Sequence, residues 1–314
     1  MTRTILLWVL ALVITLASAY YQRKTGPTYP IDGATKIEGS DIRYSLARSH
    51  GGDGDQPVTL LNPGGDVTGE LAYKRYKTTD EWTRLPLVRD GDTLRAWLPH
   101  QPPAGKLEYF IELDELGGTH RIPDHESIVT RFKGAVPGWA LIPHVIAMFL
   151  AMFVSTRAGL EAFSSKGRLR GLTIWATGLL VFGGLIFGPI VQKYAFGAFW
   201  TGFPFGTDLT DNKTLIAFVA WAVALTAVWS TERSARQPFR RWFVLAAAVV
   251  TLLVYLIPHS MMGSELDYAK LDAERARQHA HPSGTPASAD SATGLQPAES
   301  DSAAMRPQST NDAP

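Results

Sequence analysis

The chain of 314 residues contains no cysteine. This absence excludes disulfide bridges, CxxC redox motifs, zinc or iron–sulfur sites held by thiolates, and covalently attached c-type haem. The formal net charge is only +1, so the chain lacks the basic excess typical of a nucleic-acid-binding protein. The sequence also has no P-loop, HExxH or GxSxG motif and no glycine-rich dinucleotide fingerprint. Without a catalytic signature, the sequence favours a protein that is not an enzyme.

Apolar residues are concentrated in separate blocks. A helix needs about 20 mostly apolar residues to cross the roughly 30 Å hydrocarbon core of a membrane. Five blocks meet or approach this length: 4–19, 136–156, 171–192, 214–230 and 242–259. The last four blocks predict a bundle of four transmembrane helices within residues 136–262.

The first block has two interpretations. Arg3, the apolar stretch and the Ala-Ser-Ala sequence at 17–19 resemble a secretory signal peptide with its cleavage site. The same stretch also suits an uncleaved anchor helix. Under both interpretations, residues 1–20 direct the segment that follows across the membrane.

Charges in the short loops predict the orientation of the bundle. Segments 157–170 and 231–241 each contain four Lys or Arg residues and one Glu, whereas 193–213 balances two Lys with two Asp. Short loops rich in Lys and Arg stay in the cytoplasm. We therefore expect a multi-pass protein of a bacterial cytoplasmic (inner) membrane, with residues 20–135 and the C-terminus on the outer side.

Residues 31–133 have a different character. Short runs of β-branched and aromatic residues alternate with turn-forming Gly, Pro, Asn and Asp, and seven or eight such runs are present. This pattern predicts an exported all-β sandwich. The run LPHQPPAGKLEYFI (98–111) resembles the late strands of a fibronectin type III or immunoglobulin-like domain. That resemblance implies a fold and no activity.

The C-terminal part is polar. Residues 264–278 predict a short amphipathic helix. Residues 278–314 contain almost no large apolar side chain, so they cannot bury enough surface to offset the entropy of ordering. The sequence therefore predicts a disordered tail.

Polar and ionisable residues near the block ends are expected to gather at the outer face. They form one candidate polar site: His144, Gln192, Lys193, Asp208, Asp211, Lys213, His259, Glu265 and Asp267. Ionisable groups within a membrane are functional candidates, because their burial in hydrocarbon is costly.

The two histidines of this set share a local sequence, since 141–144 and 256–259 are both Leu-Ile-Pro-His. Three interpretations remain open. The imidazoles could bind one b-type haem or a copper ion, with Met261 and Met262 as soft ligands. They could relay protons or contact a ligand together with the acidic neighbours. They could also satisfy helix-end carbonyl groups that the adjacent prolines leave unpaired.

The segment 188–213 is dense in aromatic residues and glycine. Its composition suits a loop in the headgroup region, with Asp208 or Thr210 as the N-cap of the next helix. The alternative is a lid or binding platform over the outer helix ends, for a quinone, lipid or metal. Just before the loop, the GxxxG of Gly184 and Gly188 predicts close helix packing, inside the bundle or in a dimer.

Several segments carry a wider resemblance. They are TGPTYP (25–30), YKRYKTTDEWT (73–83), LPHQPPAGK (98–106), RFKGAVP (131–137), LIPH (141–144), GPIVQKYAFGAFWTGFPFGTDLTDNKT (188–214) and LIPHSMMGSELDY (256–268). In these segments the chain resembles a group of bacterial inner-membrane proteins with no assigned function, and the similarity covers residues 1–270. The resemblance implies a periplasmic setting and transfers no catalytic residue.

Together these features predict an accessory or interaction protein of the bacterial cytoplasmic membrane. The expected partners are membrane lipid and another membrane or periplasmic protein, and not nucleic acid. The alternative is a redox or metal protein in which His144 and His259 hold haem b or copper at the outer face.

Overall fold

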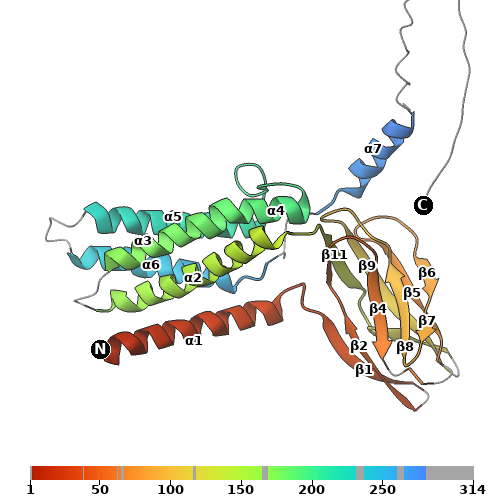
Figure 1. Ribbon diagram of the computed structural model, residues 1–314. Coiled ribbons are helices and arrows are strands. Elements are labelled where there is room, and N and C mark those ends of the chain that lie inside the picture. Colours follow the sequence, from red (N-terminus) through yellow and green to blue (C-terminus); the bar gives the residue numbers. More distant parts are fainter. Residues whose placement is uncertain are drawn as a thin grey trace, which may run out of the picture. The chain divides into compact units, whose positions relative to one another are not determined.

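The computed structural model describes residues 2–37, 39–61, 63–64, 67–115, 118–164, 169–230, 237–259 and 265–280. The chain divides into two compact units, Met1–Tyr268 and Ala269–Pro314. In the first unit a long helix is followed by the strands and then by the remaining helices (Figure 1).

The described strands form two sheets (Figure 1). The first has the order β1–β2–β4–β8–β7, made of Ile31–Ile37, Ser40–Leu46, Gln56–Leu61, Thr93–Leu98 and Val88–Asp90. The second has the order β3–β11–β9–β5–β6, made of Ser49–Gly51, Ile128–Lys133, Lys106–Glu115, Gly69–Arg75 and Thr83–Pro86, with β10 (Gly118–Ile122) paired to β9. The described pairings are antiparallel except that of β11 with β3.

The two sheets pack around one hydrophobic core. Along β4, Val58 and Leu60 are buried while Leu61 is exposed, as expected for a strand with one face on a core. The core cluster contains residues of both sheets, and Tyr109 of β9 lies within it. The expected β-sandwich is therefore present. It has more strands than predicted, because three-residue edge strands such as β3 and β7 are too short to show alternation.

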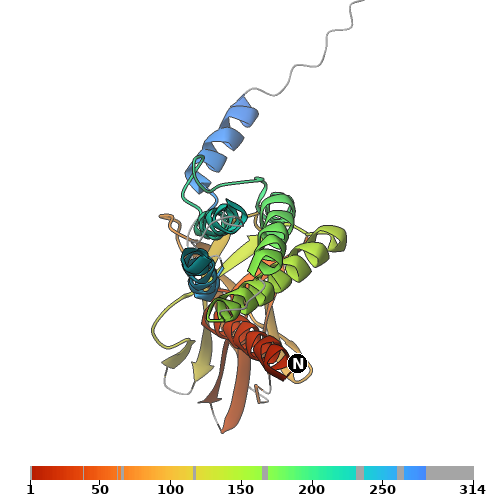
Figure 2. The same cartoon turned by 90° about the vertical axis from the view of Figure 1, so that its left-hand side faces the viewer.

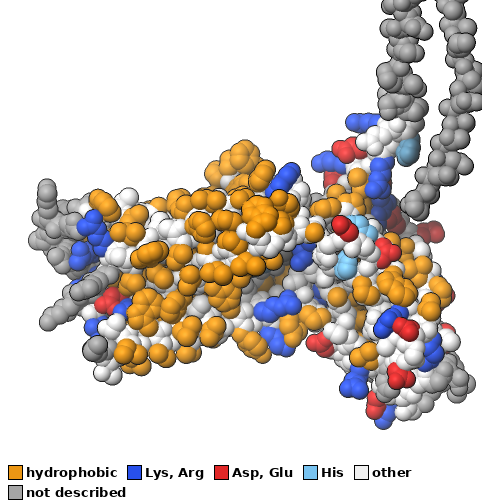
Figure 3. Space-filling model, in the orientation of Figure 1, with side chains coloured by type: hydrophobic (Ala, Val, Ile, Leu, Met, Phe, Trp, Pro, Cys, Tyr) orange, Lys and Arg blue, Asp and Glu red, His pale blue; other side chains and the backbone are white. Residues whose placement is uncertain are grey.

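Five helices in the described residues are long and apolar enough to cross a membrane. They are α1 (Thr2–Thr25), α2 (Gly138–Ala162), the continuous helical segment Leu169–Phe196, α5 (Leu209–Ser230) and α6 (Gln237–Leu256). Helices α2, α3, α5 and α6 lie side by side (Figures 1 and 2). Apolar side chains cover most of the face of the helical region that is seen in Figure 3. Such an exterior is compatible with lipid chains as the surrounding solvent.

Small residues form much of the helical core. The cluster centres on the fully buried Trp221 and contains alanines from α2, α3, α5 and α6. The indole Nε1 of Trp221 donates to Oγ1 of Thr251, 2.8 Å away on α6. Small side chains allow helices to approach closely in a membrane, and the buried indole keeps a hydrogen-bond partner.

The third apolar block is not one continuous α-helix. It consists of α3 (Leu169–Leu180), the π-helical segment η1 (Val181–Phe187) and α4 (Gly188–Phe196). Pro189 has no N–H group, and in an α-helix its ring would clash with the carbonyl four residues earlier. The wider π-helical turn before this proline relieves that clash. Gly183 and Gly184 lie within this turn, and glycine is a weak former of regular α-helix.

These glycines also pack against neighbouring helices. A Cβ atom on Gly183 would lie 2.8 Å from Cβ of Ala147 on α2. A Cβ atom on Gly184 would lie 2.7 Å from Cγ2 of Thr214 on α5. The prediction that Gly184 of the GxxxG packs inside the bundle is confirmed, whereas a Cβ atom on Gly188 would meet its nearest atoms, in Gly183 and His144, only at 3.5 Å or more.

Helix α1 contacts α2 and α6 along its length. Near its start, Nη1 of Arg3 donates to Oγ of Ser164 at 2.9 Å. Near its end, Nε2 of Gln22 donates to the backbone carbonyl of Tyr255 at 2.6 Å. These contacts join one end of α1 to the residue that lies just after α2 and the other end to α6.

The short helix α7 (Tyr268–Ala280) begins four residues later and ends two residues later than the amphipathic helix expected over 264–278. Residues 278–280, expected as the start of the tail, are therefore helical. The rest of the expected tail, and also Met261 and Met262, lie outside the described residues.

Candidate functional site

A cavity of about 150 Å³ lies where β11 meets the ends of the helices, and we call it the junction cavity. Its polar lining comes from β11, α2, α4, α5 and the turn after α6: Arg131, His144, Gln192, Asp208, Thr210, Asp211, Thr214 and His259. The structure thus brings five of the nine predicted site residues together. Both Leu-Ile-Pro-His histidines are among them.

The orientation of His144 is defined by one hydrogen bond. Its Nδ1 lies 2.8 Å from the carbonyl oxygen of Gly183 in η1. A carbonyl oxygen can only accept, so Nδ1 carries the proton and Nε2 retains its lone pair. The same carbonyl accepts the N–H of Gly188. Pro143 can leave a carbonyl group unpaired only within its own helix, α2. The carbonyl that His144 contacts belongs to Gly183 in η1, so this hydrogen bond does not serve the role expected from the adjacent proline.

The two aspartates have different structural roles. Oδ1 of Asp208 accepts the N–H groups of Thr210 at 2.8 Å and Asp211 at 3.2 Å, which makes Asp208 the N-cap of α5. Oδ2 of Asp211 accepts the N–H groups of Thr201 at 2.7 Å and Gly202 at 3.0 Å. Asp211 therefore orders the loop before α5.

The loop between α4 and α5 is tied to α4 as well. Nε2 of Gln192 in α4 donates to Oγ1 of the loop residue Thr201 at 2.7 Å and to Oδ2 of Asp211 in α5 at 3.0 Å. The loop exposes Phe199, Phe203 and Phe205, with Phe205 81% exposed. None of residues 197–207 lines the junction cavity. This arrangement favours a headgroup-region loop over a lid.

Neither of the two predicted lysines lines the junction cavity. Nζ of Lys213 donates to the carbonyl of Ile257 at 2.7 Å, just beyond α6, and lines a smaller neighbouring cavity of about 30 Å³. His259 lines both cavities. Lys193 donates to the carbonyl of Gly197 at 2.6 Å and lines neither cavity.

Glu265 lies against the sandwich instead of in the junction cavity. Its carboxylate pairs with Nζ of Lys106 at 2.5 Å and with Nζ of Lys77 at 2.9 Å. The next backbone N–H, that of Leu266, donates to the carbonyl of Ala104 at 3.2 Å. Asp267 follows in the same segment and does not line the junction cavity.

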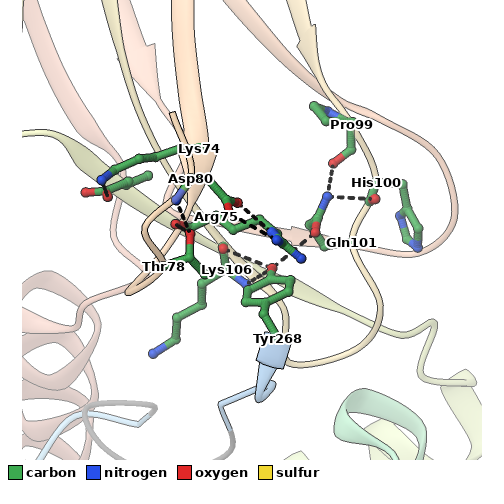
Figure 4. Close-up of polar contacts among 10 residues, drawn as sticks. Lys74, Arg75, Thr78, Asp80, Pro99, His100, Gln101, Lys106 and Tyr268 are labelled. Atoms are coloured by element: carbon green, nitrogen blue, oxygen red, sulfur yellow. Dashed lines mark hydrogen bonds and ion pairs between the residues drawn. The ribbon is translucent and has the colours of Figure 1, made fainter. Parts of the chain in front are cut away.

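Tyr268 ends this segment and is buried on the sandwich (Figure 4). Its hydroxyl lies 3.1 Å from Oε1 of Gln101 and accepts the N–H of Lys106 at 3.0 Å. The guanidinium of Arg75 lies over the ring, 5.0 Å from its centroid, and pairs with Asp80. We call Glu265–Tyr268 the return segment, because it brings the chain from α6 back to the sandwich.

Sequence reasoning missed Arg131 and Tyr268. Arg131 is 5% exposed and lines the junction cavity, with its guanidinium 5.4 Å from the ring centroid of Phe196. Tyr268 is the single aromatic residue at the start of a polar helix, a weak signal of docking. Arg131 gave no comparable signal, because Arg side chains are mostly exposed and its burial could not be read from the sequence.

Burial and charge shape the electrostatics of this region. Burial lowers the pKa of Arg131, although the charges of Glu265 and Asp208 partly oppose that shift. Burial also lowers the pKa of Lys106 and of Lys133. For Glu265, burial alone would raise the pKa, but the hydrogen bonds from Lys106 and Lys77 outweigh it and leave the pKa below its ordinary value.

The arrangement has the parts of a small binding site. Within the described residues, no group of three or more His, Cys, Asp or Glu side chains is positioned to hold a metal ion. The carboxylates of Asp208 and Asp211 already accept backbone N–H groups. His144 and His259 are the residues of the junction cavity whose ring nitrogens could coordinate a metal ion. Comparison of the chain with models of known protein families and with curated proteins finds no match.

Proposed function

We propose that the chain is a non-enzymatic accessory protein of a bacterial cytoplasmic membrane, and that its sandwich binds a partner protein on the outer side. The observation that carries this proposal is the return segment. Tyr268 lies buried on the sandwich after the chain has left α6. The sandwich is therefore held by α1, α2 and the return segment, whereas a simple tether would leave it free.

A held sandwich suits an interaction module. A binding surface kept at one height above the membrane loses less conformational entropy when a partner binds. The backbone supports the same idea, since the N–H of Gly134 after β11 donates to the carbonyl of Ala195 in α4 at 3.0 Å. The junction thus connects the sandwich directly to a helix end.

We also propose that the sandwich is immunoglobulin-like. One sheet has the order β2–β4–β8–β7, which corresponds to A–B–E–D of such domains. The other has β6–β5–β9–β11, which corresponds to an extended C, F and G sheet, with β3 added in parallel to β11. These correspondences support the proposal, and β1 is an additional edge strand.

Charge placement supports the proposed orientation. Arg157, Arg170 and Arg240 lie at the ends of α2, α3 and α6 that are remote from the junction cavity. Arg3 contacts Ser164 at the same end. Basic residues favour the cytoplasmic side, so the sandwich is expected on the outer side.

The outward face of the first sheet offers a contact surface. Leu61, Val88 and Trp97 are 48%, 54% and 46% exposed there. Aromatic side chains such as that of Trp97 are typical anchors of protein interfaces. We therefore expect the partner to contact β4, β7 and β8.

Site-specific photocrosslinking in native membranes tests this proposal. A photoreactive phenylalanine analogue replaces Trp97 or Leu61, and a matched control replaces Asp124, whose side chain is 70% exposed in a turn. We expect one protein to be captured from the two sheet positions and not from the control position. Capture of nothing, or equal capture from all three positions, would contradict the proposal.

A further inference from the structure

We propose that His144, Met148 and His259 bind one Cu(I) ion in the junction cavity. All three residues line this cavity. A metal site goes beyond the accessory role, because partner binding through the sandwich requires no metal. The two proposals therefore stand or fall separately.

His144 is oriented as a metal ligand usually is. A metal-binding histidine commonly donates its second ring N–H to a carbonyl or carboxylate, which fixes the tautomer and the ring orientation. Here Nδ1 of His144 lies 2.8 Å from the carbonyl oxygen of Gly183. The lone pair of Nε2 is thus available to an ion.

Met148 supplies a soft donor one helical turn further along α2. Residues four apart share one face of a helix, so His144 and Met148 lie one above the other. The thioether packs against η1, where a Cβ atom on Gly183 would come within 3.2 Å of Sδ. Thioether and imidazole donors together suit Cu(I) better than hard, oxygen-preferring cations.

His259 completes the set from a different part of the chain. It follows α6 in the turn after Pro258, and it lines the junction cavity together with His144. The two copies of Leu-Ile-Pro-His therefore deliver two imidazoles to one cavity from separate helices.

Formal charge favours a monovalent ion. Asp208 and Asp211 contribute two negative charges to the junction cavity, while Arg131 and the neighbouring Lys213 contribute two positive charges. The formal sum is zero, so an added cation finds no excess of negative charge. Burying one charge costs less than burying two, which favours Cu(I) over Cu(II) or Zn(II).

The size of the cavity distinguishes between a copper ion and b-type haem. Pockets for drug-sized ligands and organic cofactors have volumes of about 300–1,000 Å³. The junction cavity, at about 150 Å³, is smaller than this range. The structure therefore favours copper over b-type haem as the metal group that these histidines would hold.

Anaerobic Cu(I) titration of the full chain in mild detergent, against a competing Cu(I) chelator, tests the site. The parent protein carries His279→Ala and His281→Ala, so that the tail histidines do not contribute. We expect one Cu(I) to bind, with affinity lowered at least about tenfold in His144→Ala, in His259→Ala and in Met148→Leu. The matched controls His120→Ala and Met152→Leu should keep the parent affinity.

Spectroscopy keeps the proposal falsifiable if a variant fails to fold. X-ray absorption of the copper-loaded parent should show both nitrogen and sulfur neighbours around the metal. Absence of saturable Cu(I) binding in the parent, or a spectrum without sulfur, overturns the three-residue site. Unchanged affinity in a folded His144→Ala variant, checked by circular dichroism, also overturns it.

Discussion

Nδ1 of His144 lies 2.8 Å from the carbonyl oxygen of Gly183, so one hydrogen bond joins α2 to the π-helical segment η1. Close packing makes this bond possible, because Gly183 has no side chain to separate the two helices. The same region lines the junction cavity through Gly184 and Gly188. Helix packing and the candidate site therefore depend on the same short stretch of backbone.

Gly184→Ala should destabilise the helical region. Its Cβ atom would lie 2.7 Å from Cγ2 of Thr214, and overpacking of this kind costs about 1–3 kcal/mol. The matched control is Gly178→Ala, because a Cβ atom there meets nothing within 4 Å. That control should be neutral or stabilising by up to about 1 kcal/mol, since Ala is the better helix former. Unfolding experiments in detergent give the stability of both variants. Equal stability of Gly184→Ala and Gly178→Ala would show that Gly184 is not tightly packed against Thr214.

Tyr268→Phe should release the return segment from the sandwich. The substitution removes the hydroxyl that contacts Gln101 and Lys106, and we expect a loss of about 1–2 kcal/mol in stability. Limited proteolysis should then cut near residue 265 faster than in the parent chain. Tyr20→Phe is the control, because Tyr20 is 67% exposed on α1. Identical proteolysis of all three proteins would show that the hydroxyl does not hold the segment.

Acid should weaken the attachment through Glu265. Its pKa is lowered in the folded chain, because hydrogen bonds from Lys106 and Lys77 outweigh the effect of burial. A lowered pKa means that the stabilisation is present above the unfolded value of about 4.3 and is lost as the pH falls through the folded value. The melting temperature of Glu265→Gln should therefore lie below that of the parent chain at pH 6, and the two melting temperatures should converge under more acidic conditions. If the difference in melting temperature between the variant and the parent chain stayed constant down to pH 3, ionised Glu265 would not be its source.

Helix α1 should be retained as an anchor and not removed as a signal peptide. Arg3 contacts Ser164, and Gln22 donates to the carbonyl of Tyr255 at the end of α6. Intact mass measurement of protein purified from membranes should therefore include residues 2–25. Gln22→Ala should lower the free energy of unfolding by about 1 kcal/mol, because the carbonyl of Tyr255 loses this hydrogen-bond donor. A mature chain that begins near residue 20 would refute the anchor.

Membrane spans were predictable because length and apolar composition suffice to identify them. Each of the five apolar blocks coincides with a helix long enough to cross a membrane, although residues 136–137 precede α2 and residues 257–259 follow α6. The π-helical turn of η1 was not predicted, since it results from Pro189 and from packing of Gly183 against α2. Periodicity alone does not distinguish an α-helical from a π-helical turn.

The candidate site was predictable only in part. Block ends and the repeated Leu-Ile-Pro-His pointed to His144 and His259, which line one cavity. Arg131 reaches that cavity from β11, and only the packing of the sandwich on the helices brings it there. Glu265 was expected with the histidines, but it pairs with Lys77 and Lys106 on the sandwich. Contacts between segments this distant in the chain leave no local pattern.

We propose that the helices cross the membrane and hold the sandwich on its outer side. Because the chain contains no cysteine, single cysteines can be labelled without background. Asp124→Cys lies on the sandwich side, and Phe163→Cys, 74% exposed, lies at the opposite end of α2. With a membrane-impermeant maleimide, Asp124→Cys should label in cells whose cytoplasmic membrane is intact, and Phe163→Cys only after lysis. The reverse pattern, or labelling of both positions before lysis, would contradict the account.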